Sequence, residues 1–218
     1  MQRLRLRDDG SKTVRTRPMI IGHHLIWALY GHWLPNDPRG SGSQEIRQHK
    51  LASLGPIHLG RKPAHLQPTR GELRSFQKEA EPALEFSRCW SDDAKRQSIG
   101  DAFSEIVAKR GYTVWACAIL SNHMHAVIRR HRDDALAMWE AVADATRVAL
   151  RVPGIHLDHP IWSTRPYKVF LLTPAEVRSR IVYVAQNPKK EGLTPQEFRF
   201  VRPYDDWPFH KSHPPKPR

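Results

Sequence analysis

The sequence contains few cysteines and no long apolar run. Only Cys89 and Cys117 are present, and neither belongs to a CxxC-type pair that would indicate a zinc or redox site. This cysteine usage fits a reducing cytosol. No apolar segment is long enough to suggest a membrane span, and the basic N-terminus lacks the apolar stretch that a secretory signal requires. We therefore expect a cytoplasmic protein without a membrane partner.

Positive charge is what the sequence has in excess. Its 35 lysine and arginine residues outnumber its 22 aspartate and glutamate residues, which gives a formal net charge of +13. A surface of this charge attracts polyanions, so nucleic acid is the first partner to expect. An anionic membrane is the weaker alternative, because the sequence shows no lysine-rich amphipathic helix. A DNA-binding protein of this kind would associate with the nucleoid.

Length and proline content predict one core with long irregular connections. The chain has 218 residues, 18 of them proline. We expect a basic arm over residues 1–18, one main domain over 19–193 and a proline-rich tail over 194–218. Within the domain, the polar segment from about 36 to 90 contains one helical pattern around 71–86. We interpret this segment as an insertion without a core of its own.

Hydrophobic periodicity predicts the order strand, helix, strand, strand, helix, strand. This order is typical of the split βαβ arrangement, an α+β, ferredoxin-like or RRM-like antiparallel sheet with two helices on one face. The other face would be open for a ligand. The expected strands lie within the apolar runs 19–34, 112–120, 123–130 and 167–172.

Capping residues predict where the helices begin and end. Ser91 is a plausible N-cap for the first helix, which should end at Gly111, and Asp133 or Asp134 can cap the second. A last helix should begin at Thr173 or Pro174. It should end near Asn187, because Pro188 disfavours a helical conformation in the residue before it.

Two histidines begin the third expected strand, in the segment SNHMHAVI. Side chains alternate along a strand, so His123 and His125 should project from one face while Met124 points toward the helices. Two imidazole nitrogens would then converge on one point. Taken alone the pattern is weak evidence for a metal site, because a half-buried strand also carries histidines for ordinary hydrogen bonding.

The last expected helix carries a tyrosine and an amide, in the segment YVAQNPKKEGL. Tyr183 and Asn187 are four residues apart and therefore share one helical face. Two histidine nitrogens and one neutral oxygen would leave positions open for phosphate oxygens, as a metal acting on a phosphodiester requires. Gln186 could supply that oxygen instead of Asn187. The alternative interpretation is that Tyr183 packs against the sheet and Asn187 caps the helix.

Three segments in this order resemble the REP-associated tyrosine transposases, members of the single-tyrosine HUH endonuclease (IS200-like) transposases. SNHMHAVI is similar to the histidine–hydrophobic–histidine signature, YVAQNPKKEGL to the tyrosine-bearing helix, and HHLIWALYGHWLP to the first strand. The resemblance spans residues 19 to about 193. The insertion and the tail depart from the compact members, which work as dimers, so both a monomer and a homodimer remain open.

The resemblance implies a metal-dependent endonuclease and strand transferase that acts on single-stranded DNA, at hairpin or repeat ends. It implies Mg²⁺ or Mn²⁺ at His123 and His125, with Asn187 or Gln186 nearby. It also implies a 5′-phosphotyrosine at Tyr183 and a free 3′-hydroxyl. A tyrosine, with an ordinary pKa of about 10, needs a proton acceptor, and the sequence identifies no general base.

Basic side chains near the two motifs are candidate DNA contacts. Arg129 and Arg130 follow the histidine strand, and Lys189 and Lys190 end the tyrosine helix, so both pairs are expected to flank the site. Lys168, on the last expected strand, is a further candidate.

Other histidines and aromatic residues have weaker claims to a role. The neighbours His23 and His24 should point to opposite faces and cannot both bind one metal, so we expect them to be structural. Trp27, Trp33 and Trp162 could stack on unpaired bases, although burial is the commoner outcome for tryptophan.

Two other functions are compatible with the same residues. A non-catalytic module could bind single-stranded nucleic acid on the sheet without a metal. A metal-dependent phosphodiesterase could use water as its nucleophile, and it would then need His123 but not Tyr183.

Overall fold

A four-stranded antiparallel sheet forms the centre of the protein. The computed structural model describes residues 19–151 and 158–209. The strand order across the sheet is β2-β3-β1-β4, and every neighbouring pair is antiparallel. The α+β split βαβ order predicted from the sequence is confirmed. The strands are β1 Gly22–Ala28, β2 Val114–Ile119, β3 His123–Arg129 and β4 Tyr167–Leu171. The helices are α1 Arg70–Ala80, α2 Asp93–Arg110, α3 Ala135–Ala149 and α4 Pro174–Lys190.

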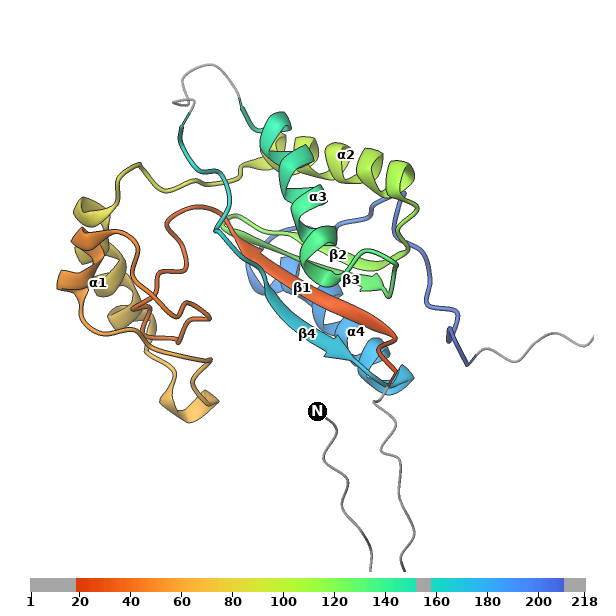
Figure 1. The fold of residues 1–218 in the computed structure, drawn as a ribbon, viewed down its shortest axis with the longest axis horizontal. Helices are drawn as coiled ribbons and strands as arrows, with labels where there is room; N and C mark the ends of the chain where they lie inside the picture. Colours follow the sequence, from red (N-terminus) through yellow and green to blue (C-terminus); the bar gives the residue numbers. More distant parts are fainter. Residues whose placement is uncertain (1–18, 152–157, 210–218) are drawn as a thin grey trace, which may run out of the picture.

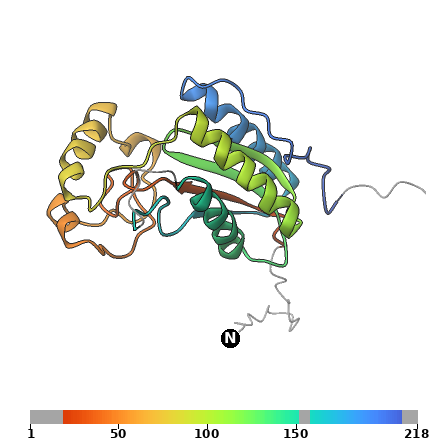
Figure 2. The ribbon, with the colours of Figure 1, turned by 90° about the horizontal axis from the view of Figure 1, so that it is seen from above.

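Helices cover both faces of the sheet. Helices α2 and α3 lie on one face, as expected, and α4 lies on the other (Figures 1 and 2). The face expected to be open is therefore partly closed, because Val177 and Val184 of α4 pack in an apolar cluster with Ala118 and Val127 of the sheet. The opposite face packs Met124, among others, against α2 and α3. Within the described parts of the chain, no helix is long and apolar enough to cross a bilayer.

Two helix boundaries differ from the prediction. The N-cap of α2 is Asp92, whose carboxylate accepts the Lys95 backbone N–H, whereas the Ser91 hydroxyl donates to the Leu120 carbonyl at 2.6 Å. Helix α4 continues past Asn187 to Lys190 with Pro188 inside it. Proline disfavours a helical residue before it but does not forbid one, and the Asn187 carbonyl still accepts the Glu191 N–H at 3.3 Å. The expected caps Gly111, Asp134 and Thr173 are confirmed.

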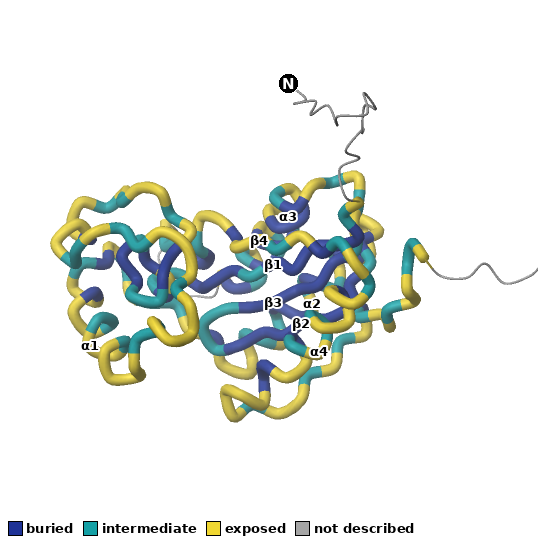
Figure 3. Tube along the Cα trace, turned by 90° about the horizontal axis from the view of Figure 1, so that it is seen from below, coloured by how far each residue is buried: buried dark blue, intermediate teal, exposed yellow. Residues whose placement is uncertain are grey.

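The insertion between residues 36 and 90 folds beside one end of the sheet and has a small core of its own. Buried Leu51, Ala80 and Leu84 form this core together with Leu34, which precedes the insertion, and Figure 3 shows it as buried segments in a separate lobe. The expectation that the insertion lacks a core is wrong, because α1 and the 3₁₀ helix His49–Leu54 close over the chain that leaves β1. Strand β1 ends at Ala28, although the apolar run in which it was predicted continues to residue 34.

The described part of the C-terminal tail runs along the outer edge of β2. The Gln196 side-chain amide accepts from the Ile119 N–H at 2.8 Å and donates to the Ile119 carbonyl at 2.7 Å. Farther along, Phe200 packs on Phe103 of α2, with ring centroids 4.8 Å apart. The tail thus covers an edge strand that would otherwise present unpaired backbone groups. The predicted arm at 1–18 lies outside the described residues, and the division into arm, domain and tail remains a prediction.

The close approach of Gly40 to Gly60 within the insertion requires a glycine at position 40. A second glycine of the same loop provides a matched control. The φ of Gly40 is +94°, and a Cβ at this position would lie 1.8 Å from the Gly60 carbonyl oxygen, whereas a Cβ on Gly42 would meet nothing within 4 Å. We expect Gly40→Ala to lower the free energy of unfolding by about 2 kcal/mol or more and Gly42→Ala to change it by less than about 0.5 kcal/mol. Urea denaturation measures both, and equal effects would contradict this account.

Candidate active site

The histidine pair of β3 points to the face that α4 covers. His123 and His125 share this face, while Met124 and Ala126 are fully buried on the other, as strand alternation predicts. The two imidazole Nε2 atoms are 3.0 Å apart. His123 Nδ1 lies 2.6 Å from the Asn122 side-chain oxygen, which can hold the ring in the tautomer with hydrogen on Nδ1. The Nε2 lone pair of His123 is then available to a ligand.

A third histidine, His24 of β1, completes a row of imidazoles. Its Nε2 lies 3.0 Å from His125 Nδ1, and the two rings are stacked with centroids 5.2 Å apart. His23 points to the opposite face, toward Phe170, so the prediction that the two neighbours diverge is confirmed. The sequence analysis expected a structural role for His24 and did not anticipate its contact with His125. Only the register between β1 and β3 could have revealed this contact, and the sequence does not state that register.

Helix α4 brings Tyr183 to the histidines. The ring centroid of Tyr183 is 5.7 Å from that of His125 and 5.9 Å from that of His24, both edge to face. One turn later, Asn187 is only 7% exposed, and its amide nitrogen has no hydrogen-bond partner within the described residues. Gln186 is exposed. Of the two amides, Asn187 is therefore the buried one.

Burial keeps the three histidines neutral at pH 7. Desolvation lowers the pKa of His24 to about 4, with a smaller contribution from the charge of Arg180. Desolvation also lowers the pKa of His123 to about 4, helped by the charge of Arg39, and it lowers that of His125 further. Neutral imidazole is the form that binds a metal ion.

Positive side chains surround Tyr183 and the histidine pair. Lys190 Nζ lies 4.7 Å from the centre of the Tyr183 ring, and the Arg180 guanidinium lies 5.9 Å from it. Arg39 and Arg61, both from the insertion, act electrostatically on His123 and His125 respectively. Sequence reasoning identified Lys190 but missed the three arginines. Lys189 is exposed near the end of α4.

One acidic side chain also reaches the site. Glu191 follows α4, and one of its carboxylate oxygens lies 3.9 Å from His123 Nδ1. The other accepts a hydrogen bond from the Ser121 hydroxyl at 3.2 Å. Within residues 19–151 and 158–209, no three His, Cys, Asp or Glu side chains are grouped as a complete metal site. A site built here would combine histidines with an amide.

Arg129 and Arg130, the basic residues at the end of the histidine strand, lie away from the histidine pair. Arg129 ends β3, six residues beyond His123, which corresponds to about 20 Å along a strand. Its guanidinium packs over the Trp207 ring at 5.1 Å. Arg130 and Lys168 line a cavity with His23 on the face opposite the histidine row. The expectation that Arg129 and Arg130 flank the histidine pair is wrong, because β3 carries them to the other end of the sheet. Their contact with DNA remains a prediction.

Of the three candidate tryptophans, only Trp33 is near the site and accessible. Trp27 and Trp162 are 1% and 4% exposed, and their rings contact each other inside the core. Trp33 is 38% exposed, and its ring centroid lies 6.2 Å from that of His123.

Solved structures match this chain with limited similarity, among them the two that follow. No protein-family model matches the chain, and no curated protein matches it. One solved structure is a REP-associated tyrosine transposase bound to a REP hairpin, with a TM-score of 0.43 and 14% identity over 84% of this chain and 75% of that chain. Another, from Deinococcus radiodurans R1, is of a protein provisionally assigned as a transposase, with a TM-score of 0.32 and 14% identity over 81% of this chain and 97% of that chain. Similarity at this level does not establish a shared function.

Acid should destabilise the fold partly through His32, which joins the insertion to the site. His32 is 3% exposed, its Nε2–H donates to the Cys89 carbonyl at 2.7 Å, and burial lowers its pKa from 6.5 to about 4. Between pH 6.5 and about pH 4, His32 binds a proton in the unfolded chain but not in the folded chain. The free energy of unfolding therefore falls as the pH falls through this range.

The variant His32→Gln removes this titration, so its pH dependence should be shallower than that of the wild type. We expect the stability difference between the two proteins to shrink by about 1–2 kcal/mol from pH 7.5 to pH 5. Urea denaturation at both pH values measures it. Parallel curves would show that His32 binds its proton equally in both states.

Proposed function

We propose that this protein is a metal-dependent endonuclease and strand transferase for single-stranded DNA, with Tyr183 as its nucleophile. The observation that carries the proposal is the position of Tyr183 on α4. Its ring lies 5.7 Å from that of His125, and the buried Asn187 follows one turn later on the same helix. A phenol from α4 and the imidazoles of β3 are thereby brought together from two elements that are distant in the sequence, and the amide of Asn187 lies one helical turn from the phenol.

The donor set fits a divalent ion of the Mg²⁺ or Mn²⁺ kind. The Nε2 atoms of His123 and His125 are 3.0 Å apart. Neighbouring ligands of an octahedral ion with bonds of about 2.1 Å are separated by about 3.0 Å, so the two nitrogens are spaced for one ion. Asn187 supplies a buried amide whose nitrogen lacks a partner within the described residues, and its oxygen is the candidate third ligand. Such an ion would withdraw charge from the scissile phosphate.

The protein's own side chains would position and stabilise the nucleophile. The bond from the Tyr183 oxygen to phosphorus forms as the bond from phosphorus to the 3′ oxygen breaks, which leaves a 5′-phosphotyrosine and a 3′-hydroxyl. Lys190 and Arg180, over the Tyr183 ring, place positive charge beside the nucleophile, where it would attract the DNA phosphate. The tyrosine ester retains the bond energy for rejoining to another 3′-hydroxyl. The hydrogen bond between His24 Nε2 and His125 Nδ1 would fix the orientation of the His125 ring.

Single-stranded DNA with hairpin or repeat ends is the substrate that this proposal expects. The net charge of +13 supports a polyanionic partner, and the sequence resemblance to REP-associated transposases supports the hairpin or repeat end. The corresponding biological role is that of a mobile-element transposase or of its domesticated relative. The protein would act as a monomer or a homodimer.

Replacement of the nucleophile tests the mechanism. We expect Tyr183→Phe to abolish both the protein-linked strand and the cleaved product when labelled DNA hairpins are incubated with Mg²⁺ or Mn²⁺ and separated on a denaturing gel. Tyr167→Phe, at an exposed tyrosine of β4, is the control and should retain both.

The outcomes separate the proposal from its rivals. Cleavage that survives Tyr183→Phe but requires His123 and metal would indicate a phosphodiesterase that uses water. DNA binding that chelator leaves unchanged, together with no cleavage of any hairpin, would indicate a binding module. Either result would overturn the proposed nucleophile.

A matched pair of amide variants tests the third metal ligand. Asn187 is buried one helical turn from Tyr183, whereas the neighbouring Gln186 is exposed. We expect Asn187→Ala to weaken Mn²⁺ binding by about tenfold or more and Gln186→Ala to leave it unchanged. Titration calorimetry with Mn²⁺ on the full chain, without DNA, measures both affinities. The reverse pattern would assign the ligand to Gln186.

A further inference from the structure

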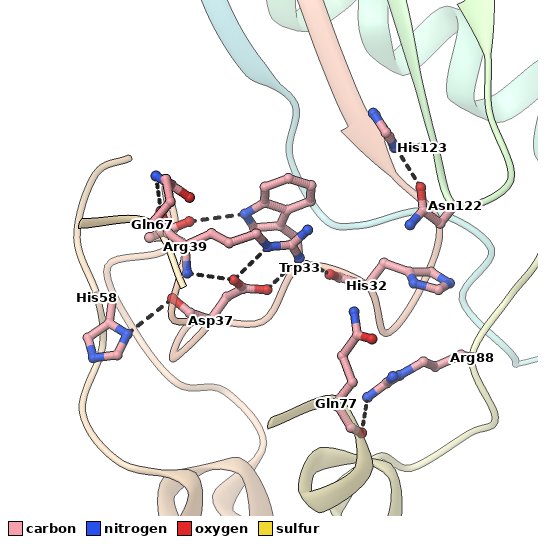
Figure 4. Close-up of polar contacts among 11 residues, drawn as sticks. His32, Trp33, Asp37, Arg39, His58, Gln67, Gln77, Arg88, Asn122 and His123 are labelled. Atoms are coloured by element: carbon pink, nitrogen blue, oxygen red, sulfur yellow. Dashed lines mark hydrogen bonds and ion pairs between the residues drawn. The ribbon is translucent and has the colours of Figure 1, made fainter. Parts of the chain in front are cut away.

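Trp33, which precedes the insertion, and Arg39, which lies within it, form a pair beside His123 (Figure 4). The guanidinium carbon of Arg39 lies 3.7 Å from the centre of the Trp33 ring. The buried carboxylate of Asp37 accepts two hydrogen bonds from the Arg39 guanidinium, from Nε at 2.8 Å and from Nη2 at 2.6 Å, and a third from the Arg39 backbone N–H at 2.9 Å. Nη2 also donates to the His32 carbonyl at 2.9 Å. These hydrogen bonds hold the guanidinium over the indole.

The surrounding backbone fixes the indole as well. Trp33 Nε1–H donates to the Gly40 carbonyl at 3.0 Å. Gly40 itself is held by a hydrogen bond from its N–H to the Asp37 carbonyl at 2.9 Å. One short loop therefore supplies the carboxylate, the guanidinium and the anchor for the tryptophan. A ligand that binds here does not have to order these side chains first, which lowers the entropic cost of binding.

The pair retains groups that are free to bind a ligand. Arg39 Nη1 makes no hydrogen bond to any residue that the structure describes, and the Arg39 side chain is 18% exposed. This N–H group is therefore accessible to a ligand. Trp33 is 38% exposed despite its contact with Arg39. An exposed aromatic surface beside a directed N–H group matches the two parts of a nucleotide, its base and its phosphate.

We infer that Trp33 and Arg39 form a nucleotide-binding subsite next to the histidine row, where the indole stacks on an unpaired base and Arg39 Nη1 donates to a phosphate oxygen. The inference rests on the proposed function and deepens it. The subsite lies 6.2 Å, ring centroid to ring centroid, from His123, so the bound nucleotide would be next to or near the scissile phosphate. The insertion thereby becomes part of the substrate-binding surface. Stacking accepts every base, so this subsite holds a single strand without reading its sequence.

The test isolates stacking from charge and from catalysis. Trp33→Leu and Trp33→Phe are made in the full chain carrying Tyr183→Phe, and binding is measured by fluorescence anisotropy in the presence of EDTA. The probes are a labelled oligothymidylate and an abasic strand of equal length and charge. We expect Trp33→Leu to bind oligothymidylate about tenfold more weakly and the abasic strand unchanged, whereas Trp33→Phe should stay within about threefold of the parent.

Controls separate this subsite from a general loss of structure. Phe170→Leu replaces an aromatic residue that is 50% exposed on β4, on the face away from the histidine row, and should leave the affinity for both strands unchanged. Thermal unfolding checks that each variant is folded. An equal loss on both strands, or no loss, would overturn the subsite while leaving the Tyr183 mechanism intact. Failure of the parent to bind either strand would overturn both.

Discussion

The antiparallel pairing of β1 with β3 fixes the site on which the other features depend. In this register His24 lies opposite Val127 and Ile26 lies opposite His125, so three imidazoles come to one face. Met124, on the other face, is fully buried against α2 and α3. A slip of one residue would exchange these faces and place apolar side chains where the histidines lie. The apolar core therefore holds the polar row in place.

Helix α4 supplies the second half of the site, and its placement leaves buried polar atoms unpaired. His24 Nδ1 and the Asn187 amide nitrogen have no hydrogen-bond partner within the described residues. Unpaired buried polar groups cost stability. Proteins tolerate such groups chiefly at functional sites, where local rules of folding are broken for a purpose. The combination of a stable sheet and an unsatisfied polar layer is what a binding or catalytic site between α4 and the sheet would require.

Local patterns predicted the parts of the fold and site that depend on nearby residues. Period-two alternation placed His123 and His125 on one face, and the spacing of four placed Tyr183 and Asn187 on one side of a helix. Contacts between distant segments were not predictable in this way. His24 reaches His125 through strand register, and Trp33 and Arg39 reach His123 through the fold of the chain that leads from β1 into the insertion. The prediction for Arg129 failed because an extended strand separates residues that are close in sequence. Arg129 and His123 lie at opposite ends of β3.

The most direct test of the central claim is to identify the residue that becomes covalently linked to DNA. Wild-type protein is incubated with hairpin DNA and Mn²⁺, then digested with nuclease and protease, and the modified peptide is sequenced by mass spectrometry. The account predicts a phosphonucleotide on Tyr183, with its 5′ phosphate attached to the phenolic oxygen. A modification on any other residue, or complete cleavage without a modified peptide, would contradict it.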